Sequence, residues 1–219
     1  MKPYYKNELT TIYNGDCLDV MDYLIEQGIK VDAIITDPPY GTTACKWDNV
    51  IPFDKMWERL KLLRKEKTPI VLFGSEPFSS HLRMSNIKEF KYDWIWEKEQ
   101  GTNQNLCNIM PMKIHEIISV FGTGKINYYP QFDTGKSYTV KRNNKIESDP
   151  IIGSSQKKID TINNGLRYPT SIVKINRELL NRYHPTQKPV SLLQYLIKTY
   201  TKEGDLILDF TSGSFNKRS

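Results

Sequence analysis

The tetrapeptide Asp37-Pro38-Pro39-Tyr40 brings together groups that can bind an exocyclic amine. Asp37 accepts hydrogen bonds, and the two prolines have carbonyls but no backbone N–H, so this stretch of backbone can only accept as well. The ring of Tyr40 can lie flat on the heterocycle that carries the amine. These properties suit a nucleobase rotated out of a duplex into a pocket. They also suit an ordinary turn with a packed aromatic ring, so the tetrapeptide alone leaves both interpretations open.

The residues before Asp37 favour the binding site. Residues 31–36 form an apolar run that predicts a buried strand, which must stop at the two prolines. Open α/β folds bind ligands at the carboxyl ends of their parallel strands. Asp37 therefore stands where such a fold places its site.

Strands and helices alternate along most of the chain. Apolar runs predict strands over residues 11–13, 31–36, 69–73, 91–98, 115–121 and 206–210. Apolar residues at helical spacing predict helices over residues 16–28, 53–63, 78–82 and 189–200. Asp16 is expected to cap the first helix and Pro189 to occupy the first position of the last one. The order predicts an α/β protein with a mostly parallel, doubly wound sheet.

Composition sets broad limits. The 219 residues are enough for one ordinary domain, and 31 Lys and Arg against 25 Asp and Glu give a charge of +6, which attracts polyanions. Cys17, Cys45 and Cys107 are odd in number and widely spaced, which predicts a reducing cytoplasm and neither disulfides nor a metal site. No apolar run is long enough to predict a membrane span.

The character of the chain changes over residues 122–173. Residues 125–174 carry nine basic and four acidic side chains and few aliphatic ones, which predicts a mobile insertion between a first part, residues 1–121, and a last part, residues 174–219. A basic, tyrosine-bearing loop can contact phosphates and stack on bases, although a solvated surface loop has the same composition. The candidate DNA-binding residues are Lys136, Lys141, Arg142, Lys157 and Lys158.

Taken in order, these pieces resemble a DNA amino-methyltransferase of the circularly permuted β class, the group that methylates adenine N6 or cytosine N4. Asp37-Pro38-Pro39-Tyr40 followed by Gly41 matches its catalytic motif. The other matching segments follow the family's order along the chain: Asn14-Gly15-Asp16, Phe73 to Phe78, His115 to Phe121, Arg167 to Ser171, His184 to Pro189 and Leu208 to Ser214.

The resemblance implies one Rossmann-like methyltransferase domain over residues 1–219, with S-adenosylmethionine as the methyl donor and double-stranded DNA as the substrate. It implies that Asp37 and the Pro38 carbonyl bind the amine, that Pro39 keeps this backbone rigid and that Tyr40 stacks on the base. Direct attack by the amine needs no protein nucleophile, and the chain has no Pro-Cys motif. The basic insertion takes the position of the target-recognition region. The implied cofactor-binding residues are Asp16, Lys188, Pro189, Asp209, Phe210 and Gly213.

The resemblance leaves several alternatives open. Asp before the prolines favours adenine over cytosine in the family, and cytosine N4 remains the second candidate. Restriction and modification, phage self-protection and regulation would all use the same residues. His115 and His184 are expected to be structural rather than metal ligands or bases.

The last residues depart from the family pattern. Phe215 stands where the cofactor loop asks for a second glycine, and a following acidic-ended strand and its helices are not in the sequence. That strand lies between the N-terminal strand and the strand that carries Asp209, so a gap with unpaired backbone is expected there. We therefore expect a methyltransferase that is truncated in its cofactor-binding part and binds S-adenosylmethionine poorly. The alternatives are a homodimer or complementing fragment that restores the site, and a DNA-binding remnant without catalysis.

Overall fold

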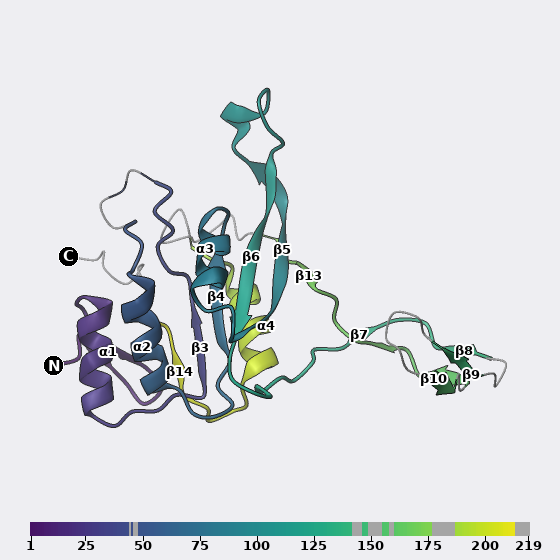
Figure 1. The fold of residues 1–219 in the computed structure, drawn as a ribbon, viewed down its shortest axis with the longest axis horizontal. Helices are drawn as coiled ribbons and strands as arrows, with labels where there is room; N and C mark the ends of the chain where they lie inside the picture. The colour runs from purple at the N-terminus through teal and green to yellow at the C-terminus, as the bar shows by residue number, and fades with distance from the viewer. Residues whose placement is uncertain are drawn as a thin grey trace. The chain divides into compact units, whose positions relative to one another are not determined.

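The computed structural model describes residues 1–43, 45, 48–141, 146–148, 155–157, 160–176 and 187–212 (Figure 1). The chain forms two compact units. The first consists of Met1–Tyr129 and Ser171–Ser219, and the second of Pro130–Thr170. The expected site residues Arg142, Lys158 and Gly213 lie outside the described residues, as does His184.

The first unit is built on a six-stranded sheet. Its strand order is β13 (Ile172–Lys174), β5 (Phe90–Thr102), β6 (Lys113–Phe121), β4 (Ile70–Gly74), β3 (Ala33–Thr36) and β14 (Ile207–Leu208). β6 is antiparallel to both β4 and β5, and the other three pairings are parallel. Five strands therefore share one direction and β6 alone is reversed, which confirms the mostly parallel sheet.

Helices cover both faces of this sheet. Helices α1 (Cys17–Glu26), α2 (Phe53–Leu63) and α3 (Phe78–Ser85) share one hydrophobic core with Ile34 and Leu72, whereas α4 (Val190–Tyr200) shares the other with Ile35 and Phe73. Ile34 and Ile35 face opposite layers because side chains alternate along a strand. In Figure 1, α4 lies behind strands β4 and β6, on the opposite side from α2. The doubly wound α/β fold is confirmed.

Local sequence sets the helix ends. The Asp16 carboxylate accepts from the Leu18 N–H at 2.8 Å and caps α1, as expected. Pro189 is not the first residue of α4 but its N-cap, with φ −57° and ψ 135°. Its carbonyl accepts from the N–H groups of Leu192 and Leu193, so the proline begins the helix without needing a donor of its own.

The N-terminal strand differs from expectation. β2 (Thr11–Ile12) pairs only with β1 (Tyr5–Lys6), in a two-stranded antiparallel ribbon apart from the six-stranded sheet. A pairing partner a few residues away closes a short loop at little entropic cost, which favours the local hairpin. The expected gap beside an N-terminal strand is therefore not seen, and within the described residues β14 pairs with β3 alone.

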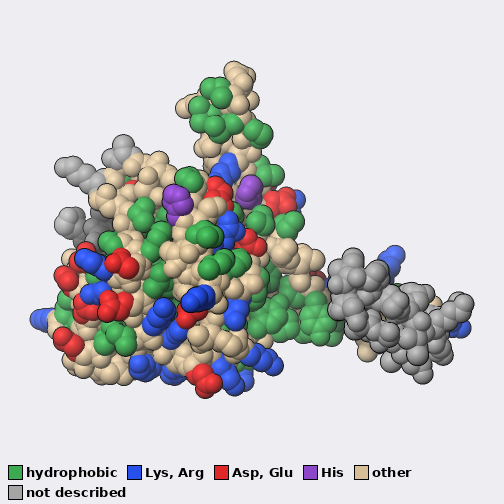
Figure 2. Space-filling model, in the orientation of Figure 1, with side chains coloured by type: hydrophobic (Ala, Val, Ile, Leu, Met, Phe, Trp, Pro, Cys, Tyr) green, Lys and Arg blue, Asp and Glu red, His purple; other side chains and the backbone are tan. Residues whose placement is uncertain are grey.

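The hairpin of β5 and β6 extends well beyond the other strands of the sheet (Figure 1). Its end contains a short 3₁₀ turn, η1 (Gln104–Leu106), and hydrophobic side chains gather there (Figure 2). The exposed apolar residues of this region are Leu106, Ile109, Met110, Met112 and Ile114.

An ion pair fastens the start of this hairpin to α2. Arg64, at the C-cap of α2, donates two hydrogen bonds to the Glu89 carboxylate at 2.7 and 2.9 Å. Their side chains are only 13% and 14% exposed. This paired Arg64 lowers the pKa of Glu89.

The second unit is a series of antiparallel pairs rather than a structureless insertion. β7 (Asp133–Thr134) pairs with β12 (Leu166–Arg167), β8 (Tyr138–Val140) with β11 (Thr161–Asn163), and β9 (Ile146–Ser148) with β10 (Ser155–Lys157). The nested order describes one long two-stranded ribbon. The segment expected to end at residue 173 ends earlier, because Ile172–Lys174 pairs with β5 in the first unit.

Candidate active site

The carboxyl edge of the first unit's sheet gathers polar side chains. Asp37 follows β3, Ser75 follows β4 and Asp209 follows β14, and these strands are parallel. Because β6 runs the other way, its beginning rather than its end meets this edge, and it carries Glu116 there. The fold thus assembles at one edge residues that are far apart in the sequence.

Asp37 is held by two donors. The Tyr40 hydroxyl donates to Oδ1 at 2.5 Å, and the Lys188 ammonium pairs with Oδ2. The Tyr40 ring packs against Phe78, with the ring centroids 5.1 Å apart. Burial, together with the negative charge of Asp37, raises the pKa of Tyr40 well above its ordinary value, so the phenol stays a neutral donor.

Lys188 joins Asp37 to a second carboxylate. Its Nζ lies 3.4 Å from Glu116 Oε2, and Glu116 Oε1 lies 2.5 Å from the Nζ of Lys98. The Lys188 ammonium also lies 5.2 Å from the centroid of the Phe73 ring. Burial disfavours the charged form of Lys188, but the attraction of Asp37 and Glu116 outweighs it and raises the pKa of Lys188.

The end of β14 is bonded to the end of β3. Thr36 Oγ1 bonds to Asp209 Oδ1 and lies 2.6 Å from Thr211 Oγ1, which in turn donates to the Asp37 carbonyl at 3.1 Å. Asp209 is exposed as a residue, yet its carboxyl group turns inward to Thr36, and burial of that group raises its pKa. These bonds hold Asp37 and Asp209 side by side.

Sequence reasoning missed Asp48, which organises the loop after the prolines. Its side chain is buried and accepts five hydrogen bonds from four consecutive residues, between 2.7 and 2.9 Å. The donors are the N–H groups of Tyr40, Gly41, Thr42 and Thr43 and the hydroxyl of Thr43. Burial opposes its ionisation, but these donors outweigh it and lower the pKa of Asp48. An aspartate a few residues after a turn was the only signal for it.

The other expected site residues are more scattered. Asp16 caps α1 and is exposed, whereas Phe210 is buried in the core with α1, α2 and α3. Pro38 is buried and Pro39 partly so. In the second unit, Lys136 and Lys141 are exposed, and the side chain of Lys157 is outside the description.

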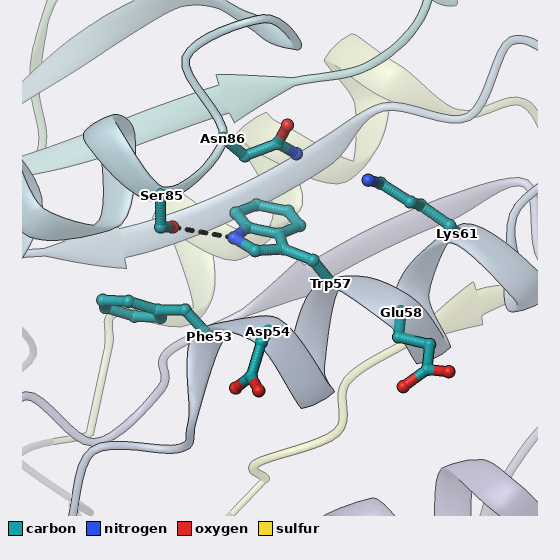
Figure 3. Close-up of a pocket in the computed structure, with 7 residues that line it drawn as sticks. All are labelled: Phe53, Asp54, Trp57, Glu58, Lys61, Ser85 and Asn86. Atoms are coloured by element: carbon teal, nitrogen blue, oxygen red, sulfur yellow. Dashed lines mark hydrogen bonds between the residues drawn. The ribbon is translucent and has the colours of Figure 1, made fainter.

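A cavity of about 560 Å³ lies elsewhere, between α2 and the end of α3 (Figure 3). Its wall includes Trp57, whose indole N–H donates to Ser85 Oγ at 2.8 Å. None of the residues drawn in Figure 3 belongs to the network around Asp37. In the described parts of the chain, no cluster of three or more His, Cys, Asp or Glu side chains could hold a metal ion, and no helix has the length and apolarity of a membrane span.

The fold defines a doubly wound α/β protein with polar side chains gathered at the carboxyl edge of its sheet. The crystal structure of the M1.HpyAVI-SAM complex matches this fold with a TM-score of 0.58 and 22% sequence identity, over 90% of this chain and 79% of that chain. Residues 31–216 match the N6_N4_Mtase family, described as DNA methylase. The chain therefore belongs to the DNA methylase family.

Curated relatives agree with this assignment. The type II methyltransferase M2.MboI of Moraxella bovis is 26% identical over 243 residues, covering 98% of this chain and 80% of that protein. The DNA adenine methyltransferase YhdJ of Escherichia coli strain K12 is 26% identical over 227 residues, covering 96% of this chain and 74% of that protein.

Replacing Asp48 tests its role in the loop. In Asp48→Asn, donors that face one carboxylate oxygen meet an amide N–H₂ instead, so the free energy of unfolding should fall by about 2 kcal/mol. Amide hydrogen exchange of residues 40–43 should accelerate at least tenfold, by an order-of-magnitude estimate from the same loss. The exposed Asp54→Asn on α2 is the control. Unchanged exchange at residues 40–43 would refute the role.

The stabilisation that the Asp48 carboxylate gives to the folded chain should depend on pH. The folded-state pKa of Asp48 is lowered, so its stabilisation is fully present above the unfolded pKa of about 3.9 and is lost as the pH falls through the folded value. The stability difference between the unaltered chain and Asp48→Asn should shrink over that acid range.

Proposed function

We propose that this chain transfers a methyl group from S-adenosylmethionine to the N6 amine of adenine in double-stranded DNA. The observation that carries the proposal is Asp37-Pro38-Pro39-Tyr40 at the carboxyl end of β3, where two donors hold the Asp37 carboxylate. Membership of the DNA methylase family and the relatedness to a DNA adenine methyltransferase support it.

Two acceptors bind the amine. The Asp37 carboxylate and the Pro38 carbonyl each take one N–H, which localises the nitrogen lone pair for direct attack. Within the described residues, no hydrogen bond is made to the Pro38 carbonyl, which leaves it free to accept one. Tyr40 stacks on the extruded base. When bound, S-adenosylmethionine supplies the methyl group: the carbon–sulfur bond breaks as the nitrogen–carbon bond forms, and the amine then releases a proton to solvent.

We propose that the residues that bind S-adenosylmethionine lie along the same edge of the sheet. Asp209, bonded to Thr36 beside Asp37, stands at the end of β14, where a donor of methyl groups must lie to reach the amine. Phe210, Gly213, Lys188, Pro189 and Asp16 complete the proposed set. The solved M1.HpyAVI-SAM complex, which shares this fold, supports a cofactor in this class of sheet.

The proposal is tested by incubating the chain with tritiated S-adenosylmethionine and duplex DNA of mixed sequence, then separating the nucleosides. Label should appear in N6-methyladenine, and Asp37→Asn should lower the rate by about 10²- to 10³-fold, because the amide lacks the charge that stabilises the developing ammonium. Asp54→Asn should retain the rate. Label in N4-methylcytosine would identify the cytosine alternative, and DNA binding without label would support the remnant.

The cofactor loop gives a separate prediction. In the unaltered chain, Phe215 occupies the position of a family glycine, and a left-handed conformation costs a non-glycine residue about 1–2 kcal/mol. Phe215→Gly should therefore bind S-adenosylmethionine about tenfold more tightly in calorimetric titrations. Phe215→Ala removes the ring but keeps Cβ, and should recover less. Micromolar binding by the unaltered chain would contradict this expectation.

The second unit is proposed to contact the DNA backbone. Lys136 and Lys141 are exposed there, whereas the Arg167 guanidinium is held by the Lys136 carbonyl at 2.5 Å and lies over the Tyr138 ring. The two lysines are therefore better placed than Arg167 to bind phosphate.

Measurements of DNA affinity against salt concentration test this contact. Lys136→Ala and Lys141→Ala should each weaken binding and reduce the slope of log K against log salt by about 0.9, the contribution of one phosphate contact. Lys55→Ala, an exposed lysine on α2, is the matched control. An unaltered slope in both variants would exclude the contact.

A further inference from the structure

Four charged side chains of alternating sign connect Asp37 to the interior of the first unit. Asp37 pairs with Lys188, Lys188 with Glu116, and Glu116 with Lys98. Asp37 directly follows β3, Lys98 lies within β5, Glu116 lies in the first half of β6, and Lys188 directly precedes the α4 N-cap. We call this set the charge chain.

The charge chain is shielded from water. Lys98 is 7% exposed, the Lys188 side chain 10% and the Glu116 side chain 17%, whereas Asp37, at 31%, is the most open member. Buried ion pairs add little stability compared with apolar side chains of the same size, because desolvation offsets their attraction. Stability alone is therefore a weak explanation for four charges that end on Asp37.

We propose that Lys188 and Glu116 are positioning residues for methyl transfer: Glu116 holds the Lys188 ammonium against Asp37, and Lys188 holds the Asp37 carboxylate in a fixed orientation for the amine. This inference rests on the proposed function, because it concerns how Asp37 meets the amine. Neither Glu116 nor Lys98 would touch the substrate. Their effect passes through Lys188.

The reason lies in what a carboxyl group can do in each protonation state. An ionised carboxylate only accepts hydrogen bonds and has about four lone-pair positions, whereas a protonated one presents an O–H to the incoming N–H₂. Tyr40 and Lys188 occupy one position on each oxygen of Asp37, which leaves room for an N–H of the amine. The two donors also fix the plane of the carboxylate.

Several carboxylates surround the contact between Lys188 and Asp37. Besides Asp37 and Glu116, the carboxylate of Asp48 faces Tyr40, and that of Asp209 faces Asp37. Lys188 is the cation in direct contact with Asp37 among the described residues.

Two further lysines lie near Glu116. Lys98 pairs with it directly, and Lys113 lies near Lys98, Glu116 and Glu76, with its ammonium bonded to Ser75 Oγ. Without Lys188, these cations would remain bound to Glu116 and Ser75, and the Asp37 carboxylate would lose the cation that orients it.

The first test needs no substrate. Lysines labelled with carbon-13 at Cε are followed by NMR as the pH is raised, and the Lys188 signal is assigned from Lys188→Arg. In Glu116→Gln the pKa of Lys188 should fall, because one of the two anions that offset its burial is gone. In the control Glu89→Gln, which removes a similarly shielded carboxylate from Arg64, the pKa of Lys188 should not change. An unchanged Lys188 titration in Glu116→Gln would overturn the assignment of Glu116.

The second test is kinetic. Lys188→Met should lower the single-turnover rate of methyl transfer, measured at saturating S-adenosylmethionine, about 100-fold, the loss typical of one preorganised charge-stabilising donor. Lys188→Arg should restore most of the rate, since it keeps the cation, and Glu116→Gln should lose about tenfold.

The outcomes separate positioning from folding. Glu89→Gln should lower the melting temperature without changing the rate or the Lys188 titration. If Lys188→Met and Glu116→Gln behave like this control, the positioning role is refuted. If the unaltered chain transfers no methyl group to any DNA, the proposed function fails, and the lysine titration still decides whether Glu116 controls Lys188.

Discussion

The ion pair between Lys188 and Asp37 joins parts of the chain that are 151 residues apart. It connects the residues before α4 to the end of β3, and the Thr211 bond to the Asp37 carbonyl connects the end of β14 to the same residue. Asp37 is therefore fixed from two directions, through its side chain and through its backbone. The segment of Asp37 and the later segments of Lys188 and Thr211 lie together because both later segments bond to Asp37.

The direction of β6 determines which residues can join that site. A parallel β6 would carry Glu116 away from the carboxyl edge, since its beginning would then lie at the opposite end of the sheet. The reversed strand instead brings Glu116 between Lys188 and Lys98, and it pairs with β5 from Lys113 to Phe121 and with β4 from Ile117 to Phe121. One antiparallel strand thus supplies the carboxylate that two buried lysines require.

Local patterns in the sequence were enough to predict most of the elements of the first unit. The apolar run before Asp37, the Asp16 cap and the helical spacing in α2 each depend on neighbouring residues, and the structure confirms them. Other features depend on which of several distant or competing partners a segment binds. These are the direction of β6, the five bonds to Asp48 and the pairing of β2 with β1. In residues 130–170, polar composition hid an antiparallel ribbon because its strands are two or three residues long.

The two units differ in how their charged side chains are paired. The edge around Asp37 concentrates carboxylates, yet a DNA substrate is a polyanion, so unbalanced carboxylates there would repel it. Lys188 and Lys98 offset Asp37 and Glu116 one for one, which leaves a nearly neutral charge chain. Phosphate attraction must then come from cations that are not already paired with this edge. The overall charge of +6 and the exposed Lys136 and Lys141 of the second unit supply cations that are not part of the charge chain.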